Sequence, residues 1–482
     1  PSPTGYLHIG GLRTALYNFL LARHDGGTAV LRIEDTDRSR FVSDAEEDIH
    51  RALSWAGLAF DEGPEYGGEL GPYRQSQRTA HYSAAADELL AAGHAYLAFD
   101  TAEDLDVLRN SPAPEGQGVN RYSSTTRMSM KNSLSLDPAE VQRLLQEGTP
   151  HVVRLKVPTG ETVTFKDIIR GEVAFRSEEI DDQILVKSDG MPTYHLANVV
   201  DDHLMGITHV IRGEEWLPST PKHVLLYQAL GWDVPQLAHL PLILSPTGGK
   251  LSKRNAASQG IPVLVRDYVE AGFEPEALLN YIALLGWNPG TDRELFDLED
   301  LIREFSLDRV GSSGVQFSMD KLRWFNEQHL RQLDTDGLVQ RVRPHLTAAG
   351  FRPTDDFLQR VVELMRERII LASDLADADY FFRDPDTFDP KGVAKRWKDD
   401  SPALLSEYAK RLEEDDNFGA SSAEEVLRGL ADELEVGAGR IIHPVRLALS
   451  GVTFGPGLFE LMEVLGQESS VRRIRSAVRL LA

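Results

Sequence analysis

Two short segments, far apart in the chain, contain residue types that bind and neutralise phosphate groups. One is Pro-Ser-Pro-Thr-Gly-Tyr-Leu-His-Ile-Gly-Gly at residues 1–11, and the other is Lys-Leu-Ser-Lys-Arg at residues 250–254. Glycine lets the backbone approach a ligand closely, and a helix that begins after such a turn attracts anions. Lysines in a glycine-flanked loop can stabilise the charge that develops during phosphoryl transfer. Either segment alone also fits an ordinary solvated turn, but together they predict a nucleotide-binding active site.

A second set of residues has the chemistry of an amino-acid binding site. Arg212 and Glu215 follow a predicted strand, and an arginine offers a planar pair of donors to a carboxylate. Glu34 can accept hydrogen bonds from an ammonium group, and Tyr194 and Asn198 add neutral polar groups. The set predicts an amino-acid substrate, although each residue taken singly also fits a surface ion pair or a structural hydrogen bond.

The composition limits the class of protein. With 482 residues the chain is too long for one hydrophobic core, and we expect roughly three to five domains. It has no cysteine, which excludes disulfides, a thiol nucleophile and a cysteine-ligated zinc site. No run of about 18 apolar residues predicts a membrane helix. Since no secretory signal is recognised either, a cytoplasmic location is expected.

The net charge of −24 favours an acidic protein without a nucleic-acid partner. Nucleic-acid binding depends on local basic patches, however, and not on the total charge. Residues 471–479, Val-Arg-Arg-Ile-Arg-Ser-Ala-Val-Arg, are one local exception to the acidity. The net charge therefore does not exclude a nucleic-acid partner.

The elements that must position these residues alternate between helix and strand in the first part of the chain. Apolar residues at 12, 15, 16, 19 and 20 predict a helix that ends at Gly26-Gly27. Residues 29–33 then predict a short buried strand, with Glu34 at its carboxyl end, where doubly wound sheets bind ligands. Helices are predicted at 43–57 and 78–93, a loop at 109–135, and strand pieces at 151–157 and 163–175.

Buried strands are also predicted at residues 186–201 and 209–212. Helical patterns follow at 262–272, 275–285 and 298–305, and they cover almost everything from about residue 310 onward. The chain therefore divides into an α/β front half, with a strand-containing insert at about residues 95–185, and an all-α back half.

Several motifs recur in the order in which one known family has them. Besides residues 1–11 they are Arg-Ile-Glu-Asp-Thr-Asp at 32–37, Gly-Pro-Tyr-Arg-Gln-Ser at 71–76, the segment 187–203, Arg-Gly-Glu-Glu-Trp at 212–216, Leu-Ser-Lys-Arg at 251–254 and Lys-Leu-Arg-Trp at 321–324. On these motifs the chain resembles the bacterial glutamyl-tRNA synthetases, which are class I aminoacyl-tRNA synthetases. Gly11, where the class I signature usually has histidine, narrows the resemblance to this bacterial branch.

The resemblance implies an α/β Rossmann-type class I catalytic domain with an inserted α+β acceptor-arm module, followed by an all-α C-terminal anticodon-binding region. Its expected parts are the catalytic domain at 1–95 and 186–245, the acceptor-binding insert at 96–185, a stem-contact helical domain at 246–310, and anticodon-binding helical domains at 311–370 and 371–482.

The resemblance also implies the activity of a glutamate–tRNA ligase. Such an enzyme activates L-glutamate with ATP and Mg²⁺ to glutamyl-adenylate, and transfers it to the 3′-terminal adenosine of tRNA(Glu). By resemblance the catalytic residues are His8, Lys250 and Lys253. The ATP-binding residues carried over are His8, Gly10, Glu215, Lys250, Ser252, Lys253 and Arg254.

The positions that match the family's glutamate site are Ser2, Glu34, Tyr194, Asn198 and Arg212. Glu34 is expected to hold the α-ammonium group and Arg212 the γ-carboxylate. A neutral amide would leave the guanidinium unpaired, at a cost of several kcal/mol. The family also has an arginine a few residues before the Pro-Ser-Pro stretch, and a chain lacking it is expected to bind glutamate weakly.

In the helical half, Arg368, Arg446 and Leu458 match anticodon contacts of the family, although singly they also fit solvated helix arginines and a core leucine. Arginine can hydrogen-bond base edges, and unpaired loop bases are accessible to it. Some members bind zinc through cysteine. Because this chain has no cysteine, no structural zinc is expected here. The expected partners are tRNA(Glu), L-glutamate and ATP, with no membrane contact and a monomeric state.

Two alternatives to a specific glutamate–tRNA ligase are considered. One is a non-discriminating enzyme that also charges tRNA(Gln), and the other is a catalytically inactive RNA-binding regulator. An inactive regulator is expected to have lost phosphate-binding cations, whereas Lys250 and Lys253 are present. The short paralogue that glutamylates a modified tRNA base lacks the helical region that this chain has.

Overall fold

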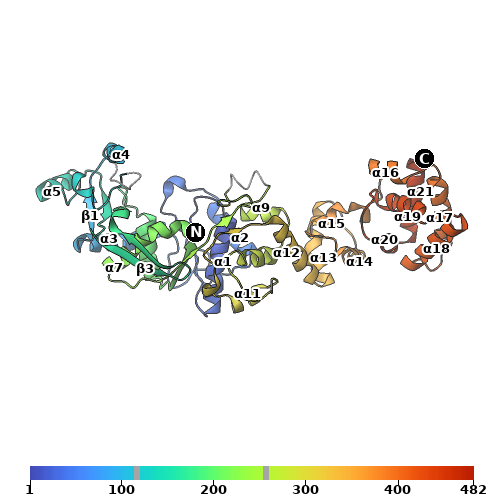
Figure 1. Ribbon diagram of the computed structural model, residues 1–482, viewed down its shortest axis with the longest axis horizontal. Coiled ribbons are helices and arrows are strands. Elements are labelled where there is room, and N and C mark those ends of the chain that lie inside the picture. Colours follow the sequence, from blue (N-terminus) through green and yellow to red (C-terminus); the bar gives the residue numbers. More distant parts are fainter. Residues whose placement is uncertain (113–119, 253–259, 482) are drawn as a thin grey trace. The chain divides into compact units, whose positions relative to one another are not determined.

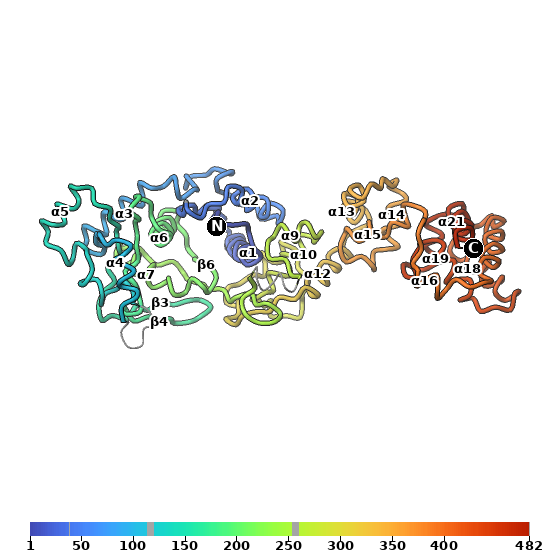
Figure 2. The backbone as a smooth tube through the Cα atoms, turned by 90° about the horizontal axis from the view of Figure 1, so that it is seen from above, coloured from blue at the N-terminus to red at the C-terminus, as the bar shows by residue number. Residues whose placement is uncertain are grey.

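The computed structural model describes residues 1–112, 120–252 and 260–481. Lys253 and Arg254 lie outside the described residues. The chain forms two compact units, Pro1–Ala271 with Leu278–Met319, and Gly272–Ala277 with Asp320–Ala482. Figure 1 shows the labelled strands in the first unit, and Figure 2 follows the backbone of each unit from a second direction.

A four-stranded sheet in the first unit has the order β4–β3–β7–β6. Its strands are β3 (Thr162–Asp167), β4 (Gly171–Arg176), β6 (His209–Gly213) and β7 (Gln236–Leu240). β7 pairs in parallel with both β3 and β6, whereas β3 and β4 form an antiparallel hairpin. The carboxyl ends of β3, β6 and β7 therefore share one edge, where side chains from all three strands can meet.

The helices predicted from apolar periodicity before residue 305 are confirmed. Helix α1 (Ile9–His24) buries Leu12, Leu16 and Leu20 completely. The other predicted ranges contain α2 (Ala45–Trp55), α3 (Thr79–Ala91), α9 (Val265–Glu270), α10 (Pro275–Ala283) and α11 (Leu298–Glu304). The observed ends differ from the predicted ends by a few residues, as helix termini commonly do.

The prediction of a strand at residues 29–33 is only partly right. The segment is extended, but it makes two isolated parallel bridges, Val30 with Glu62 and Ile33 with Arg74, instead of a ladder. The partner segment leaves the pairing between these two bridges, so consecutive ladder bonds cannot form. Glu34 still follows directly after the second bridge, at the end of the extended segment.

The buried strand predicted at residues 186–201 is wrong for most of its length. Only β5 (Ile184–Val186) is a strand there, and α6 (Tyr194–Leu204) follows it. Every residue of α6 from 196 to 202 is buried, including the polar Asn198, Asp201 and Asp202, so the polar side of this helix faces other side chains and not water. The strand predicted at 209–212 is confirmed as β6.

The stretch predicted as an insert contributes to two sheets. Strands β1 (Ala95–Ala98), β2 (Val152–Leu155) and β5 form an antiparallel sheet in the order β1–β2–β5. The same stretch contains α4 (Ala102–Asn110) and α5 (Pro138–Gln146). Its β3–β4 hairpin instead joins the four-stranded sheet through β7. Later elements of the unit are α7 (Thr220–Ala229), β8 (Ile243–Leu244) and β9 (Val315–Gln316).

The second unit is built from helices throughout its described residues, as the sequence predicts. They are α12 (Met319–Gln332), α13 (Thr335–Ala348), α14 (Asp355–Met365), α15 (Asp374–Asp377), α16 (Pro390–Arg396), α17 (Ser401–Glu413), α18 (Ala420–Glu433), α19 (Gly439–Ser450), α20 (Leu458–Leu465) and α21 (Gln467–Leu480). One continuous apolar core runs from Leu330 to Ala477. Across the described part of the chain, no helix combines the length and the apolar character needed to cross a membrane.

Candidate active site

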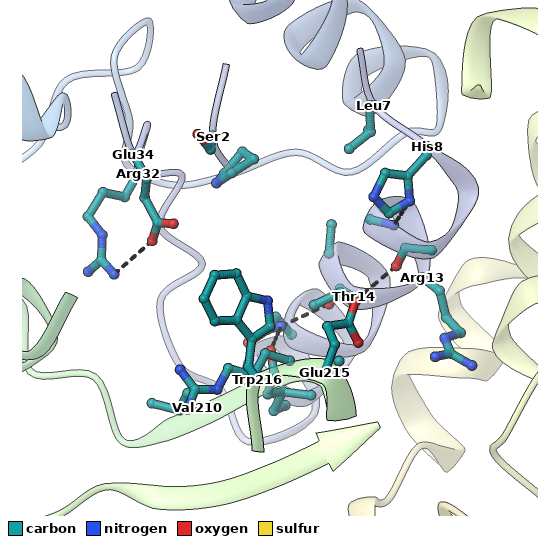
Figure 3. Close-up of a pocket in the computed structure, with 18 of the residues that line it drawn as sticks. Ser2, Leu7, His8, Arg13, Thr14, Arg32, Glu34, Val210, Glu215 and Trp216 are labelled. Atoms are coloured by element: carbon teal, nitrogen blue, oxygen red, sulfur yellow. Dashed lines mark hydrogen bonds and ion pairs between the residues drawn. The ribbon is translucent and has the colours of Figure 1, made fainter. Parts of the chain in front are cut away.

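A cavity of about 660 Å³ lies in the first unit, beside β6 and the segment that follows it. It collects every described residue that the sequence assigns to catalysis, ATP or glutamate, namely Ser2, His8, Gly10, Glu34, Tyr194, Asn198, Arg212, Glu215, Lys250 and Ser252. Figure 3 shows Arg32 and Glu34 together on one side, and His8 and Glu215 on the other. The predicted site residues therefore come from distant segments but line one space.

His8 lies where the glycine-rich turn meets α1. It is the N-cap of this helix, and its Nδ1 accepts a hydrogen bond from the backbone N–H of Gly11 at 3.0 Å. In the neutral ring the proton is therefore on Nε2, which makes that atom a donor. Gly10 contacts the ring closely, since a Cβ added there would lie 3.2 Å from Nδ1. The start of α1 lines the same cavity, so this corner suits a phosphate.

Acidic side chains surround Arg32 on another wall of the cavity. The partly buried guanidinium of Arg32 donates to Glu34 at 3.3 Å, to Asn198 at 3.1 Å and to Asp202 at 2.8 Å. Burial opposes the charge of Arg32, but the carboxylates, Asp202 foremost, outweigh it and raise the pKa of Arg32. This one cation hydrogen-bonds two carboxylates and lies 3.9 Å from a third, that of Asp201, so this wall favours a positively charged group of a ligand.

Arg212 has the opposite surroundings. Its guanidinium is 7% exposed, and it donates only to neutral groups in the described part of the chain. The acceptors are His239 Nε2 at 3.1 Å, the Tyr194 hydroxyl at 3.2 Å, His223 Nδ1 at 3.2 Å and Thr220 Oγ1 at 2.9 Å. Burial lowers the pKa of His223 well below its ordinary value, with Arg212 adding to the effect, so this ring stays neutral. A buried cation with neutral partners favours an anionic ligand.

Tyr194 and Trp216 form an aromatic wall beside Arg212. Their ring centroids lie 4.7 Å apart, and both residues line the cavity. Burial raises the pKa of Tyr194 to about 12, so its hydroxyl keeps its proton at neutral pH. Since the oxygen accepts from Arg212, the proton can be donated to a ligand.

Glu215 and Lys250 form an ion pair at the cavity, with Nζ of Lys250 3.0 Å from Oε1 of Glu215. Lys250 lies on a tight hairpin that pairs it with Leu244. Burial raises the pKa of Glu215, but its own backbone N–H and Lys250 outweigh burial, and the net shift is downward. Gly213 lets the Glu215 carboxylate lie against the backbone, since an added Cβ would lie 2.1 Å from it and the side chain would have to shift.

Comparisons with known proteins give the family of this site. A family model for the catalytic domain of class I tRNA synthetases (E and Q) matches residues 1–324, and an anticodon-binding domain model matches residues 337–478. The glutamate–tRNA ligase of Chlorobaculum parvum is 46% identical over 491 residues, which cover 99% of this chain and 96% of that protein. The chain belongs to the glutamate–tRNA ligase family of class I tRNA synthetases.

Other members of the glutamate–tRNA ligase family are similar over their whole length. The Porphyromonas gingivalis (strain W83) protein is 47% identical, with 100% of this chain and 98% of that protein covered. The crystal structure of a glutamate tRNA ligase from Elizabethkingia meningosepticum, in complex with its amino acid, matches with a TM-score of 0.94 at 42% identity. The match covers 100% of this chain and 98% of the Elizabethkingia meningosepticum chain. A class I catalytic domain followed by a helical anticodon-binding domain is thus confirmed.

The residues that match the family's anticodon contacts lie in the second unit. Arg368 is exposed just beyond α14, Arg446 is half-buried on α19, and Leu458 is buried as the first residue of α20. Nη1 of Arg446 is buried and has no hydrogen-bond partner among the described residues. Burial lowers the pKa of Arg446, and Tyr380 opposes this shift. A contact with the anticodon stays a prediction for all three.

Sequence reasoning missed Arg32 and Asp202 as parts of the site. One signal was available, because Arg32 and Glu34 are two residues apart in an extended segment and share a side. The partners of Arg32 are Asn198 and Asp202, 166 and 170 residues away. No spacing within one segment identifies such partners, which only the fold brings together.

Proposed function

We propose that this protein is an ATP-dependent ligase that activates L-glutamate as glutamyl-adenylate and transfers it to the 3′-terminal adenosine of tRNA(Glu). Its membership of the glutamate–tRNA ligases supports this activity. The observation that carries the proposal is the charge pattern of the cavity. A buried guanidinium with neutral partners, Arg212, shares the cavity with the carboxylates of Glu34 and Asp202. An amino acid with an acidic side chain has the matching charges.

Glutamate fits this cavity in one orientation. Its γ-carboxylate pairs with Arg212 and its α-ammonium group with Glu34, while Tyr194, Asn198 and Ser2 supply further polar contacts. Glutamine presents a neutral amide to Arg212, so the buried charge stays uncompensated. A site built to pair a charged group discriminates strongly against an analogue without it.

The phosphates of ATP fit the corner made by His8, Gly10 and the start of α1. Nε2 of His8 is a donor, and the first-turn N–H groups of α1 favour an anion. Lys250 and Ser252 line the same cavity, with Glu215 as the partner of Lys250. We further assign phosphate contacts to Lys253 and Arg254, which follow directly in the sequence. Mg²⁺ arrives as part of the Mg–ATP substrate.

Activation and transfer are two displacements. An α-carboxylate oxygen of glutamate attacks the α-phosphorus of ATP, and pyrophosphate leaves with the electron pair of the broken P–O bond. A ribose hydroxyl of the terminal adenosine then attacks the carbonyl carbon of the mixed anhydride, loses its proton, and AMP leaves. The side chains of the cavity contribute by positioning and by charge stabilisation.

We assign the two ends of tRNA(Glu) to different parts of the chain. The segment 96–185 is the proposed acceptor-arm module, and residues 246–310 form the proposed stem-contact domain. Domains at 311–370 and 371–482 are proposed to bind the anticodon through Arg368, Arg446 and Leu458. The unpaired bases of the anticodon loop are accessible, and arginine can hydrogen-bond their edges. We further propose that the enzyme is cytoplasmic and monomeric.

Aminoacylation tests the proposal. The purified protein is given ATP, labelled glutamate and either purified tRNA(Glu) or purified tRNA(Gln). We expect ATP-dependent charging of tRNA(Glu) and much weaker charging of tRNA(Gln). Equal charging of the two would establish the non-discriminating alternative. Binding of tRNA without any charging would establish the inactive regulator and contradict the proposed activity.

A further inference from the structure

Three charged or polar side chains form a row across three neighbouring strands of the sheet. Asp167 ends β3, His239 lies on β7, and Arg212 lies on β6 opposite His239 in the parallel register. Oδ2 of Asp167 is 2.6 Å from Nδ1 of His239, and Nε2 of His239 is 3.1 Å from Nε of Arg212. Asp167 and His239 are completely buried. The row thus connects a carboxylate without access to the cavity to the arginine proposed to select glutamate.

The two ends of this row fix the proton of His239. Arginine nitrogens only donate, so Nε2 of His239 must accept from Arg212, and the ring proton lies on Nδ1, donated to Asp167. Burial lowers the pKa of His239, and Asp167 only partly offsets this shift, so the ring stays neutral. The other neutral tautomer of His239, with its proton on Nε2, would direct an N–H at the guanidinium of Arg212.

The opposite side of Arg212 is held in the same way. His223 Nδ1 accepts from Arg212, so in the neutral ring Nε2 of His223 donates to Nδ1 of His195, 3.0 Å away. With Thr220 and Tyr194 as further acceptors, four of the five N–H donors of Arg212 are engaged by groups of fixed position. The guanidinium plane therefore has one orientation toward the cavity.

We propose that Asp167 is a positioning residue for glutamate selection, acting through His239 to hold Arg212 in the orientation that receives the γ-carboxylate. This inference rests on the proposed function. Asp167 does not line the cavity, and the proposed route of its effect on glutamate is the tautomer of His239. ATP contacts, at His8 and Lys250, are not part of the row.

Asp167→Asn tests the inference directly because Asp167 also makes backbone hydrogen bonds that fix how an asparagine would be oriented. Oδ1 of Asp167 accepts the backbone N–H groups of Ile169 and Arg170, both at 2.9 Å, at the turn between β3 and β4. If the asparagine oxygen keeps this role, its NH₂ faces Nδ1 of His239. The histidine must then accept there and carry its proton on Nε2, which lies 3.1 Å from Nε of Arg212 and 3.0 Å from Oγ1 of Thr220, so Arg212 loses this acceptor. The same wrong-tautomer effect is known for an Asp-to-Asn change in the serine-protease triad.

The measurement is the steady-state aminoacylation of tRNA(Glu), with glutamate and ATP varied in turn. We expect Asp167→Asn to raise KM for glutamate about 10- to 100-fold and to leave KM for ATP within about twofold of wild type. The matched control is Asp182→Asn, which removes another completely buried carboxylate, one bonded to Tyr96 and Arg127. It should leave the ratio of the two KM values unchanged. Equal glutamate KM values in Asp167→Asn and wild type would overturn the inference.

A pair of His239 variants gives an answer even if Asp167→Asn does not fold. His239→Asn keeps a donor toward Asp167 but has no atom at the Nε2 position, so glutamate KM should rise about tenfold. His239→Gln can supply an acceptor near Nε2 and should bind glutamate more tightly than His239→Asn. The reverse order would overturn the inference. If the wild-type protein itself fails to charge tRNA(Glu) with glutamate, the proposed function fails. If the wild-type protein charges normally but the variants have no effect, only the positioning role of Asp167 fails.

Discussion

Arg212 and His239 are register partners on the neighbouring parallel strands β6 and β7, and Nε of Arg212 lies 3.1 Å from Nε2 of His239. The strand pairing itself thus brings a neutral acceptor against a buried cation. The arginine is held without being neutralised, which leaves its charge for a ligand. An aspartate in place of His239 would hold Arg212 equally well but cancel that charge.

Arg212→Gln should remove the preference for glutamate. Losing one partner of a buried ion pair costs about 3–5 kcal/mol, so kcat/KM for glutamate should fall roughly 10²- to 10⁴-fold. Arg109→Gln, an exposed change of the same kind on α4, is the control and should match wild type. Retained glutamate preference in Arg212→Gln, measured with glutamate and glutamine in parallel, would refute the assigned role.

Glu34→Gln should weaken glutamate binding through its ammonium group. A hydrogen bond to a charged group contributes about 1.5–3 kcal/mol, so KM for glutamate should rise roughly 10- to 100-fold while KM for ATP stays constant. The exposed Glu47→Gln on α2 is the matched control. An equal rise in both KM values would point to a general disturbance around Arg32 instead of a lost substrate contact.

Lys250→Ala should slow adenylate formation much more than it weakens tRNA binding. Removing one group that stabilises developing charge lowers kcat by about 10²-fold. Lys253→Ala is expected to act in the same direction. Pyrophosphate exchange in the presence of tRNA, together with a tRNA binding titration, checks both variants, with the exposed Arg51→Ala on α2, outside the segments assigned to tRNA, as control. Normal exchange rates would exclude a role for the altered lysine at the phosphates.

His195 should make stability depend on pH. Burial lowers the pKa of His195 from 6.5 to about 4, so below pH 6.5 the unfolded state binds a proton that the folded state refuses. Stability is therefore lost as pH falls through this window, by roughly 3 kcal/mol at 1.36 kcal/mol per unit. Thermal unfolding of His195→Gln should show a flatter pH dependence than wild type. The exposed His81→Gln should not, and identical slopes for His195→Gln and wild type would contradict the assignment.

Arg446→Ala should raise KM for tRNA(Glu) about tenfold or more, because a paired arginine contact with a base contributes about 1–3 kcal/mol. KM for glutamate and ATP should not change. The exposed Arg428→Ala on α18 removes the same charge elsewhere in the second unit and serves as control. Equal effects of the two variants would indicate a general electrostatic contribution and not an anticodon contact.

The segments that carry chemistry were predictable because local sequence determines them. The glycine-rich turn before α1 needs only its own residues, and the apolar stripe of α1 follows from helical spacing. Residues 194–201 were wrongly predicted as strand, although Tyr194, Asn198 and Asp201 have the spacing of one helix side; Asn198 and Asp201 are buried and face other side chains. The helical spacing of these polar residues was therefore a local signal that the strand prediction did not use.

The partners of the site residues were not predictable from spacing. Glu34 was assigned from its motif, but the place of the partly buried Arg32 in the site is clear only from its contact with Asp202, 170 residues away. His239 and Asp167 are 72 residues apart and belong to no motif that the sequence offers. Which strands become neighbours decides such contacts, and strand order depends on packing across the whole unit.

The most direct measurement compares kcat/KM for glutamate and glutamine with the wild-type protein and purified tRNA(Glu). A buried, unneutralised Arg212 predicts a preference for glutamate of at least about 10³-fold, since a site that pairs a charge rejects the neutral analogue. Comparable values for the two amino acids, or charging with neither, would contradict the central claim that this cavity selects an acidic side chain for transfer to tRNA.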